Sequence, residues 1–401
     1  MPVANQNIPL KIVVSRTYAT PCKQKPMVAI MNENGYSVKY PRKVLLRKGM
    51  TGLGKVLLSL MADIKINGKE RLPEKGPIIL AGNHVAVMEA VLMAVYNPGL
   101  VEFIGNGDIP FDPNYAFIAN AYGLIPVNRG NLDLKGLQMG LDVLDQNGIL
   151  CVFPEGGIWN PAQMQAQIGV AWLSYKSKAP VLPSGFGGMQ DALNKILKFK
   201  HPTLEMNVGE VLPPVELKDD TLTMKENLQI AANQILGEIN ALIPHEDLRR
   251  FHKKVDEKYE LEINVFPLTS KEDIPEAYQI KHGYAYAHFL FNPTMMDVLY
   301  RNLSLPIRPI KEVIFKDNFD PILSAWQSIL DYLADNPGYF TYRFGVEEGL
   351  AVREALEELI RLGKWVQQSG YDLTLYPIRR YRNANTGARV IERGGCFPKG
   401  M

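Results

Sequence analysis

Residues 63–243 contain short apolar runs that alternate with stretches of helical character. The apolar runs, which are typical of buried strands, lie at 77–81, 149–153 and 180–186. The predicted helices lie at 85–96, 133–145, 161–174 and 227–242. Because strands alternate with helices, the pattern predicts an α/β domain whose sheet, mostly parallel or mixed, is covered by helices on both faces.

The pattern changes after Pro244. Residues 246–260 are strongly charged, which predicts an exposed connecting helix. Beyond it, helical periods at 322–333 and 352–366 precede a predicted strand at 372–376. A chain of 401 residues also exceeds what one hydrophobic core usually serves.

We therefore divide the chain into three parts. The predicted parts are a basic N-terminal segment at 1–49, an α/β domain at 50–245, and a charged linker helix with a C-terminal α+β appendage at 246–401.

Charge is uneven although the net charge is only +2. Residues 1–50 carry nine Lys or Arg against the single acid Glu33, and residues 376–401 carry six against Glu392. Basic ends on an acidic body favour contact with an anionic lipid surface or a nucleic acid, while solvated arms are the alternative. Residues 43–48 and 56–61 mix basic and apolar side chains as interfacial helices do.

Membrane spans and disulfides are not expected. The apolar stretches are too short to cross a bilayer, and the N-terminus lacks the layout of a signal peptide. Cys22, Cys151 and Cys396 form no CxxC pair, which favours a reducing compartment, and Cys151 fits a core position. We expect a cytoplasmic protein that attaches peripherally to the inner face of a membrane.

The residues that indicate chemistry begin at Asn83 and His84, where a predicted strand ends and a helix begins. The positive end of a helix keeps a histidine neutral and able to accept a proton. Glu89 follows five residues later and can hold the imidazole in one tautomer. This arrangement can activate a hydroxyl supplied by a substrate. A histidine that caps its own helix is the alternative.

Three further segments follow in order. Residues 123–129 end a predicted strand at Arg129, a side chain suited to bind phosphate. Residues 152–157 leave a buried strand and enter a turn that carries Glu155, and 179–183 lead into an apolar strand with Pro183.

In this order the four segments resemble the glycerol-3-phosphate and lysophosphatidate acyltransferase family, the PlsC-like group. The family motifs are NHxxxxD, a strand ending in arginine, FPEGT, and an apolar strand with proline. The resemblance covers roughly residues 50–245.

The resemblance implies transfer of a fatty acyl group from acyl-CoA or acyl-ACP to the hydroxyl of a glycerol phosphate or lysophospholipid. His84 would be the general base and Glu89 its orienting acid. The implied substrate-binding residues are Asn83, Arg129, Glu155, Gly156, Gly157 and Pro183. Arg129 would bind the acceptor phosphate, and Pro183 would line the acyl pocket. The co-substrate would suffice, without a cofactor or a metal ion.

Two departures from the family motifs keep an alternative open. The family aspartate is Glu89 here, and FPEGT ends in Gly157, followed by Ile158 and Trp159. A catalytically degraded homologue that binds acyl lipids is therefore the second hypothesis.

Two other motifs receive structural interpretations. Residues 49–55 resemble a phosphate-binding loop without its hydroxyl, so we expect the entry to an apolar helix. In the C-terminal part, the basic run 379–382 after two helices resembles a winged-helix module. There we expect a packing or membrane-docking role rather than nucleic-acid binding.

Overall fold

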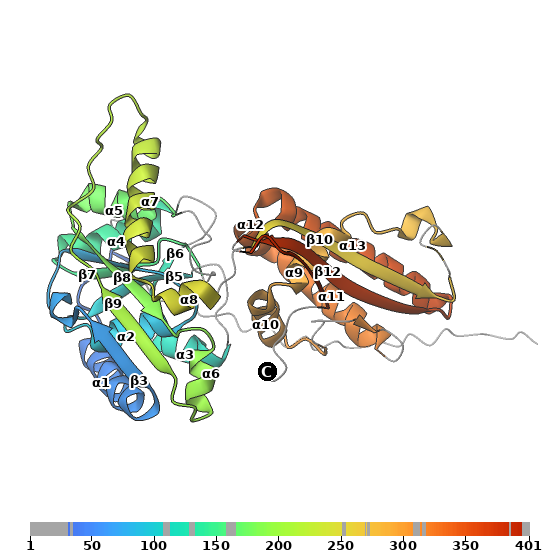
Figure 1. Ribbon diagram of the computed structural model, residues 1–401, viewed down its shortest axis with the longest axis horizontal. Coiled ribbons are helices and arrows are strands. Elements are labelled where there is room, and N and C mark those ends of the chain that lie inside the picture. The colour runs from blue at the N-terminus through green and yellow to red at the C-terminus, as the bar shows by residue number, and fades with distance from the viewer. Residues whose placement is uncertain are drawn as a thin grey trace, which may run out of the picture.

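The computed structural model arranges the chain in two lobes, one from the N-terminal half and one from the C-terminal part (Figure 1). The structure describes residues 31–32, 35–106, 113–127, 133–157, 166–250, 254–268, 270, 273–307, 313–314, 318–384 and 386–394. A short hairpin of β1 (Met31–Asn32) and β2 (Gly35–Tyr36) precedes the first lobe. Within the described residues, no helix has both the length and the hydropathy needed to cross a membrane.

A seven-stranded sheet forms the centre of the first lobe, in the order β3-β9-β8-β4-β7-β5-β6. Its strands are β3 (Asp63–Asn67), β4 (Ile78–Gly82), β5 (Val101–Asn106), β6 (Ile125–Val127), β7 (Ile149–Val152), β8 (Val181–Gly187) and β9 (Thr203–Val208). All pairs are parallel except β8 with β9, which is antiparallel. The predicted mixed sheet is confirmed.

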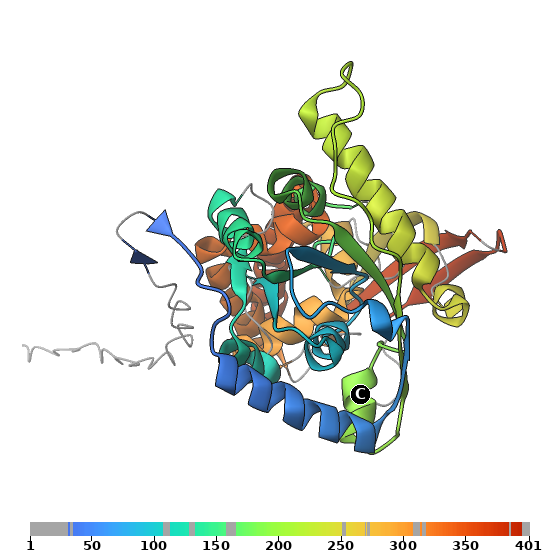
Figure 2. The same ribbon diagram turned by 90° about the vertical axis from the view of Figure 1, so that its left-hand side faces the viewer.

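Helices cover both faces of this sheet (Figures 1 and 2). One face carries α1 (Val44–Met61), α2 (Met88–Tyr96), α3 (Pro113–Tyr122) and α6 (Ala192–Leu197). The other face carries α4 (Leu134–Asp145), α5 (Gly169–Ser177) and α7 (Met224–Leu242). Along β4, alternate side chains enter the two cores, Leu80 on the α2 side and Ile79 on the α7 side. A short 3-10 turn, η1 (Lys69–Arg71), follows β3.

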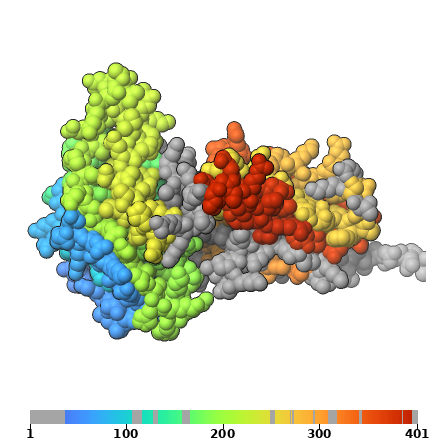
Figure 3. Space-filling model, in the orientation of Figure 1, coloured from blue at the N-terminus to red at the C-terminus, as the bar shows by residue number. Residues whose placement is uncertain are grey.

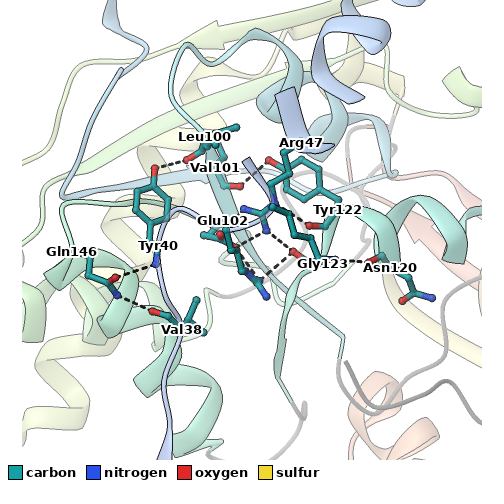
Figure 4. A network of polar contacts seen from close by, with 12 residues as sticks. Val38, Tyr40, Arg47, Leu100, Val101, Glu102, Asn120, Tyr122, Gly123 and Gln146 are labelled. Atoms are coloured by element: carbon teal, nitrogen blue, oxygen red, sulfur yellow. Dashed lines mark hydrogen bonds and ion pairs between the residues drawn. The ribbon is translucent and has the colours of Figure 1, made fainter. Parts of the chain in front are cut away.

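Three of the N-terminal basic residues form contacts within this lobe (Figure 4). Helix α1 crosses the boundary that we predicted between residues 49 and 50. The Arg47 side chain is fully buried and forms an ion pair with Glu102 of β5, and Arg42 bonds the same carboxylate. Lys43 donates to the carbonyl oxygens at the end of α3. Three of the basic residues therefore fasten α1 to the lobe. Residues 49–55 lie within α1, as expected for a helix rather than a phosphate loop.

The second lobe is an antiparallel sheet with one helix-covered face. Its strands are β10 (Lys254–Phe266), β11 (Val313–Ile314), β12 (Asp372–Asn383) and β13 (Arg389–Arg393), in the order β10-β12-β11, with β13 also paired to β12. Its helical segments are η3 (Glu276–Tyr278), α9 (Gly283–Leu290), α10 (Pro293–Asn302), α11 (Phe319–Asp335), α12 (Gly338–Phe344) and α13 (Val346–Gln368). Trp326, fully buried, lies in the core between the helices and the sheet.

The predicted connecting helix at 246–260 is wrong for most of its length. Helix α8 spans only His245–Arg250, and β10 begins at Lys254. Apolar and polar side chains alternate in the second half of β10, where Leu261, Ile263 and Val265 are buried. Glu260, Glu262 and Asn264 alternate with them on the outer face of the sheet. The polar and charged residues of this stretch therefore reflect a strand with one solvent-facing side.

The basic run 379–382 belongs to this outer sheet, whose C-terminal residues gather on one face of the space-filling view (Figure 3). Each arginine of the run is paired with a carboxylate of a neighbouring strand: Arg379 with Glu392, Arg380 with Glu260 and Arg382 with Asp256. These ion pairs connect β12 to β13 and to β10 within the sheet.

Candidate active site

The candidate site lies at the carboxyl ends of β4, β7 and β8. Because β4 pairs in parallel with both neighbours, the turns that leave the three strands meet at one edge of the sheet. Asn83 connects two of them. Its Nδ2 donates to the carbonyl oxygen of Phe186 at 3.2 Å, and its Oδ1 accepts from the Phe186 N–H at 2.7 Å.

His84 follows at the start of the turn into α2. Its side chain keeps 15% of its accessible surface. The imidazole stacks on the ring of Phe153, which follows β7, with 4.2 Å between centroids and 15° between planes. Its Nδ1 is buried and has no hydrogen-bond partner among the described residues. The ring is thus held on one face while part of it reaches solvent.

Glu89 folds back over the turn from the first turn of α2. Its Oε1 accepts from the N–H groups of Val85 at 2.8 Å and Ala86 at 2.9 Å. Its Oε2 lies 3.7 Å from His84 Nδ1, beyond a hydrogen bond but close enough to favour a proton on that nitrogen. These bonds hold the turn at residues 85–86, and α2 begins after it, at Met88 rather than at the predicted residue 85.

Glu155 approaches His84 from the other side of the turn. Its Oε2 accepts the His84 backbone N–H at 2.7 Å, and the residue is 2% exposed. Burial raises the pKa of Glu155 to about 8, against the lowering effect of this hydrogen bond, and the nearby Glu89 also raises it. The protonated form therefore dominates at neutral pH.

The other residues expected at the site are placed differently. Gly156 follows Glu155 with a φ of +73°, a conformation that favours glycine, and Gly157 is buried beside it. Pro183 lies inside the buried strand β8, where its carbonyl oxygen accepts the Gly209 N–H at 2.9 Å. Arg129 lies outside the described residues, so its contact with phosphate stays a prediction.

One contact at the site is not evident from the residue types alone. Phe153 precedes the acidic turn, and an apolar residue at a strand end is most simply read as core. Its stacking on His84 becomes visible only when β4 and β7 lie side by side. The described residues hold no group of three His, Cys, Asp or Glu side chains placed to bind a metal ion.

Comparison with known proteins gives matches of three kinds. Residues 63–187 match a protein-family model described as Acyltransferase. The 1-acyl-sn-glycerol-3-phosphate acyltransferase of Bacillus subtilis (strain 168) is 22% identical over 189 residues, covering 46% of this chain and 92% of that protein. The 1-acyl-sn-glycerophosphate acyltransferase PlsC from Thermotoga maritima is 17% identical, with a TM-score of 0.37, over 51% of this chain and 85% of that structure. The family model and the B. subtilis relative confirm the resemblance that the four motifs indicate.

Proposed function

We propose that the PlsC-like acyltransferase domain of this chain moves a fatty acyl group from a thioester donor to the hydroxyl of a glycerol phosphate or lysophospholipid. The donor is acyl-CoA or acyl-ACP, as co-substrate, and the proposal includes no cofactor or metal ion. The observation that carries it is the placement of His84. Its imidazole is partly exposed at the carboxyl end of the sheet, with a carboxylate facing one ring nitrogen.

His84 would act as the general base. The Glu89 carboxylate favours a proton on Nδ1, which leaves Nε2 free to accept the proton of the acceptor hydroxyl. The oxygen then attacks the thioester carbonyl, and the tetrahedral intermediate collapses with release of the thiolate. The imidazolium returns its proton to that thiolate. Because the thioester is already activated, positioning and proton transfer suffice.

The acceptor would bind beside the turns that follow β4 and β7. We propose that Arg129 binds its phosphate and that Gly156 and Gly157 leave room for its glycerol part. For Asn83 and Pro183, whose polar groups bond within the sheet, a part in substrate binding would be indirect. The glycine at 157 removes the hydroxyl of the family motif, so acceptors other than lysophosphatidate belong in any assay.

The decisive experiment incubates the protein and its His84→Gln variant with labelled acyl-CoA or acyl-ACP and a panel of lysophospholipids and alcohols. Loss of the base is expected to lower turnover by about a hundredfold to ten-thousandfold. His201→Gln, at an exposed histidine before β9, serves as the matched control and should retain parent activity. Variant turnover within a few-fold of the parent would remove the catalytic assignment. Lipid binding by the parent without turnover would favour the degraded homologue.

We also propose peripheral attachment to the cytoplasmic face of a membrane, with α1 as the contact. Along this helix Leu45, Leu53 and Leu60 are 88%, 62% and 65% exposed. Leu58, in contrast, packs into the lobe. Lys48 beside the apolar stripe is also exposed. A helix with one packed face, one exposed apolar stripe and flanking lysines is typical of interfacial helices.

A further inference from the structure

The turn that follows β7 contacts His84 at two points. Phe153 covers one face of the imidazole, and Glu155 accepts the backbone N–H of the same residue. We propose that Phe153 and Glu155 are positioning residues for His84, Phe153 by holding the orientation of the imidazole ring and Glu155 by holding the backbone that carries it. This inference rests on the proposed role of His84 as general base, and it gives Glu155 a different role from the acceptor contact implied by the family motif.

Strand pairing explains why the two contacts coincide. Ala81 of β4 lies opposite Val152 of β7 in a parallel register. His84 lies three residues beyond Ala81, and Glu155 lies three residues beyond Val152. The two segments therefore leave the sheet at the same level, and His84 and Glu155 come to lie side by side. Phe153, directly after the strand, is then placed against the ring.

The stack is important because hydrogen bonds do not orient this ring. The described residues give Nδ1 no hydrogen bond, and Glu89 is 3.7 Å away. Glu89 and Glu155 instead bind the backbone N–H groups of residues 84–86, which fixes the turn but not the rotation of the imidazole. Among the contacts of the described residues, the stack on the Phe153 ring limits this rotation. Small errors in the placement of a catalytic group are costly.

Glu155 is poorly placed to bind an acceptor directly. The residue is 2% exposed, and one of its oxygens already accepts the His84 N–H. A residue that binds an acceptor equally well in the ground and transition states affects mainly KM. A residue that positions the base affects mainly kcat.

The first test replaces Phe153 by Leu and by Tyr. We expect Phe153→Leu to lower kcat at least about tenfold, with the acceptor KM nearly unchanged, because the base is no longer held in place. Phe153→Tyr keeps the ring and should retain most of the activity. The matched control is Phe103→Leu in β5, a buried phenylalanine whose ring meets that of Tyr122 edge to face. It should lower stability without this effect on kcat.

The second test separates the two roles of Glu155. Glu155→Gln keeps an oxygen that can accept the His84 N–H, so its kcat should stay within about threefold of the parent, whereas Glu155→Ala should lose at least about tenfold. A rise in acceptor KM in both variants, with kcat unchanged, would overturn the positioning role and restore the acceptor contact.

A readout independent of activity completes the design. In protein with isotope-labelled histidine, the His84 ring signals, assigned with the His84→Gln variant, should carry a ring-current shift from Phe153. Phe153→Leu should remove this shift, and Phe153→Tyr should retain it. Unchanged His84 signals in Phe153→Leu would overturn the stacking itself. If Phe153→Leu removed the ring-current shift while kcat stayed unchanged both in this variant and in His84→Gln, the assignment of His84 as the base would instead be wrong.

Discussion

Arg47 and Glu102 form an ion pair in which both side chains are fully shielded from solvent. The second guanidinium nitrogen, Nη2, lies 2.9 Å from Glu102 Oε2 and 2.9 Å from the carbonyl oxygen of Gly123 (Figure 4). The guanidinium also lies over the ring of Tyr122, 4.5 Å from its centroid. This pair connects α1 to β5 and to the end of α3.

Breaking this pair should destabilise the protein strongly. Glu102→Gln leaves the guanidinium buried without its counter-charge, and we expect a loss of about 3–5 kcal/mol in the free energy of unfolding, measured with urea. Arg380→Met, which breaks an exposed pair with Glu260, should cost less than about 1 kcal/mol. Equal costs at the two sites would show that α1 does not depend on the buried pair.

Glu89 should combine support of the turn before α2 with an electrostatic role. Glu89→Gln keeps an oxygen that can accept from Val85 and Ala86, so the free energy of unfolding should stay within about 1 kcal/mol of the parent. The same variant removes the charge that faces His84, and kcat should fall at least about tenfold. If kcat were unchanged in Glu89→Gln and lower only in Glu89→Ala, the role of Glu89 would be limited to holding the turn before α2.

Stability should depend on pH through Glu155. Its pKa is about 8 in the folded protein and near 4.5 in the unfolded chain. Between these values the unfolded chain releases a proton that the folded protein keeps. The contribution of Glu155 to the free energy of unfolding is therefore fully present below about pH 4.5 and is lost as pH rises toward 8. The loss from this group is at most about 1.4 kcal/mol per pH unit.

The comparison with Glu155→Gln isolates that contribution. Urea unfolding from pH 5.5 to 8.5 should show a smaller fall in stability for the variant than for the parent. Parallel curves for the two proteins would show that Glu155 ionises normally in the folded state.

The exposed stripe of α1 should control membrane binding. Replacing Leu53, Leu57 and Leu60 together by Gln should weaken binding to anionic phospholipid vesicles, measured by sedimentation, at least about a thousandfold. Burial of each leucine contributes about 1.5–3 kcal/mol, and about 1.4 kcal/mol is a factor of ten in affinity. Ile230→Gln, at an exposed position of α7 across the sheet, is the control and should bind as the parent does. Undiminished binding by the triple variant would exclude α1 as the contact.

The sequence by itself determined the three central strands of the first lobe, several of the helices that cover them, and the order of the motifs. Strands β4, β7 and β8 appear as uninterrupted apolar runs because both faces of the sheet are covered. Helix α4 was evident from the spacing of its apolar residues, and the structure adds that the Asp133 side chain accepts the Gly136 N–H as its N-cap. These features depend on neighbours within a few residues, so a linear pattern contains them.

The tertiary structure alone decided the relationships between distant segments. The charged stretch before residue 260 became the strand β10 because β12 pairs with it more than a hundred residues later. The basic residues Arg42 and Arg47 turned inward because Glu102 is buried beneath them, which no count of N-terminal charge reveals. Phe153 and Glu155 reached His84 because two parallel strands end side by side. In each case the partner is brought close by packing, whose energy depends on the whole fold.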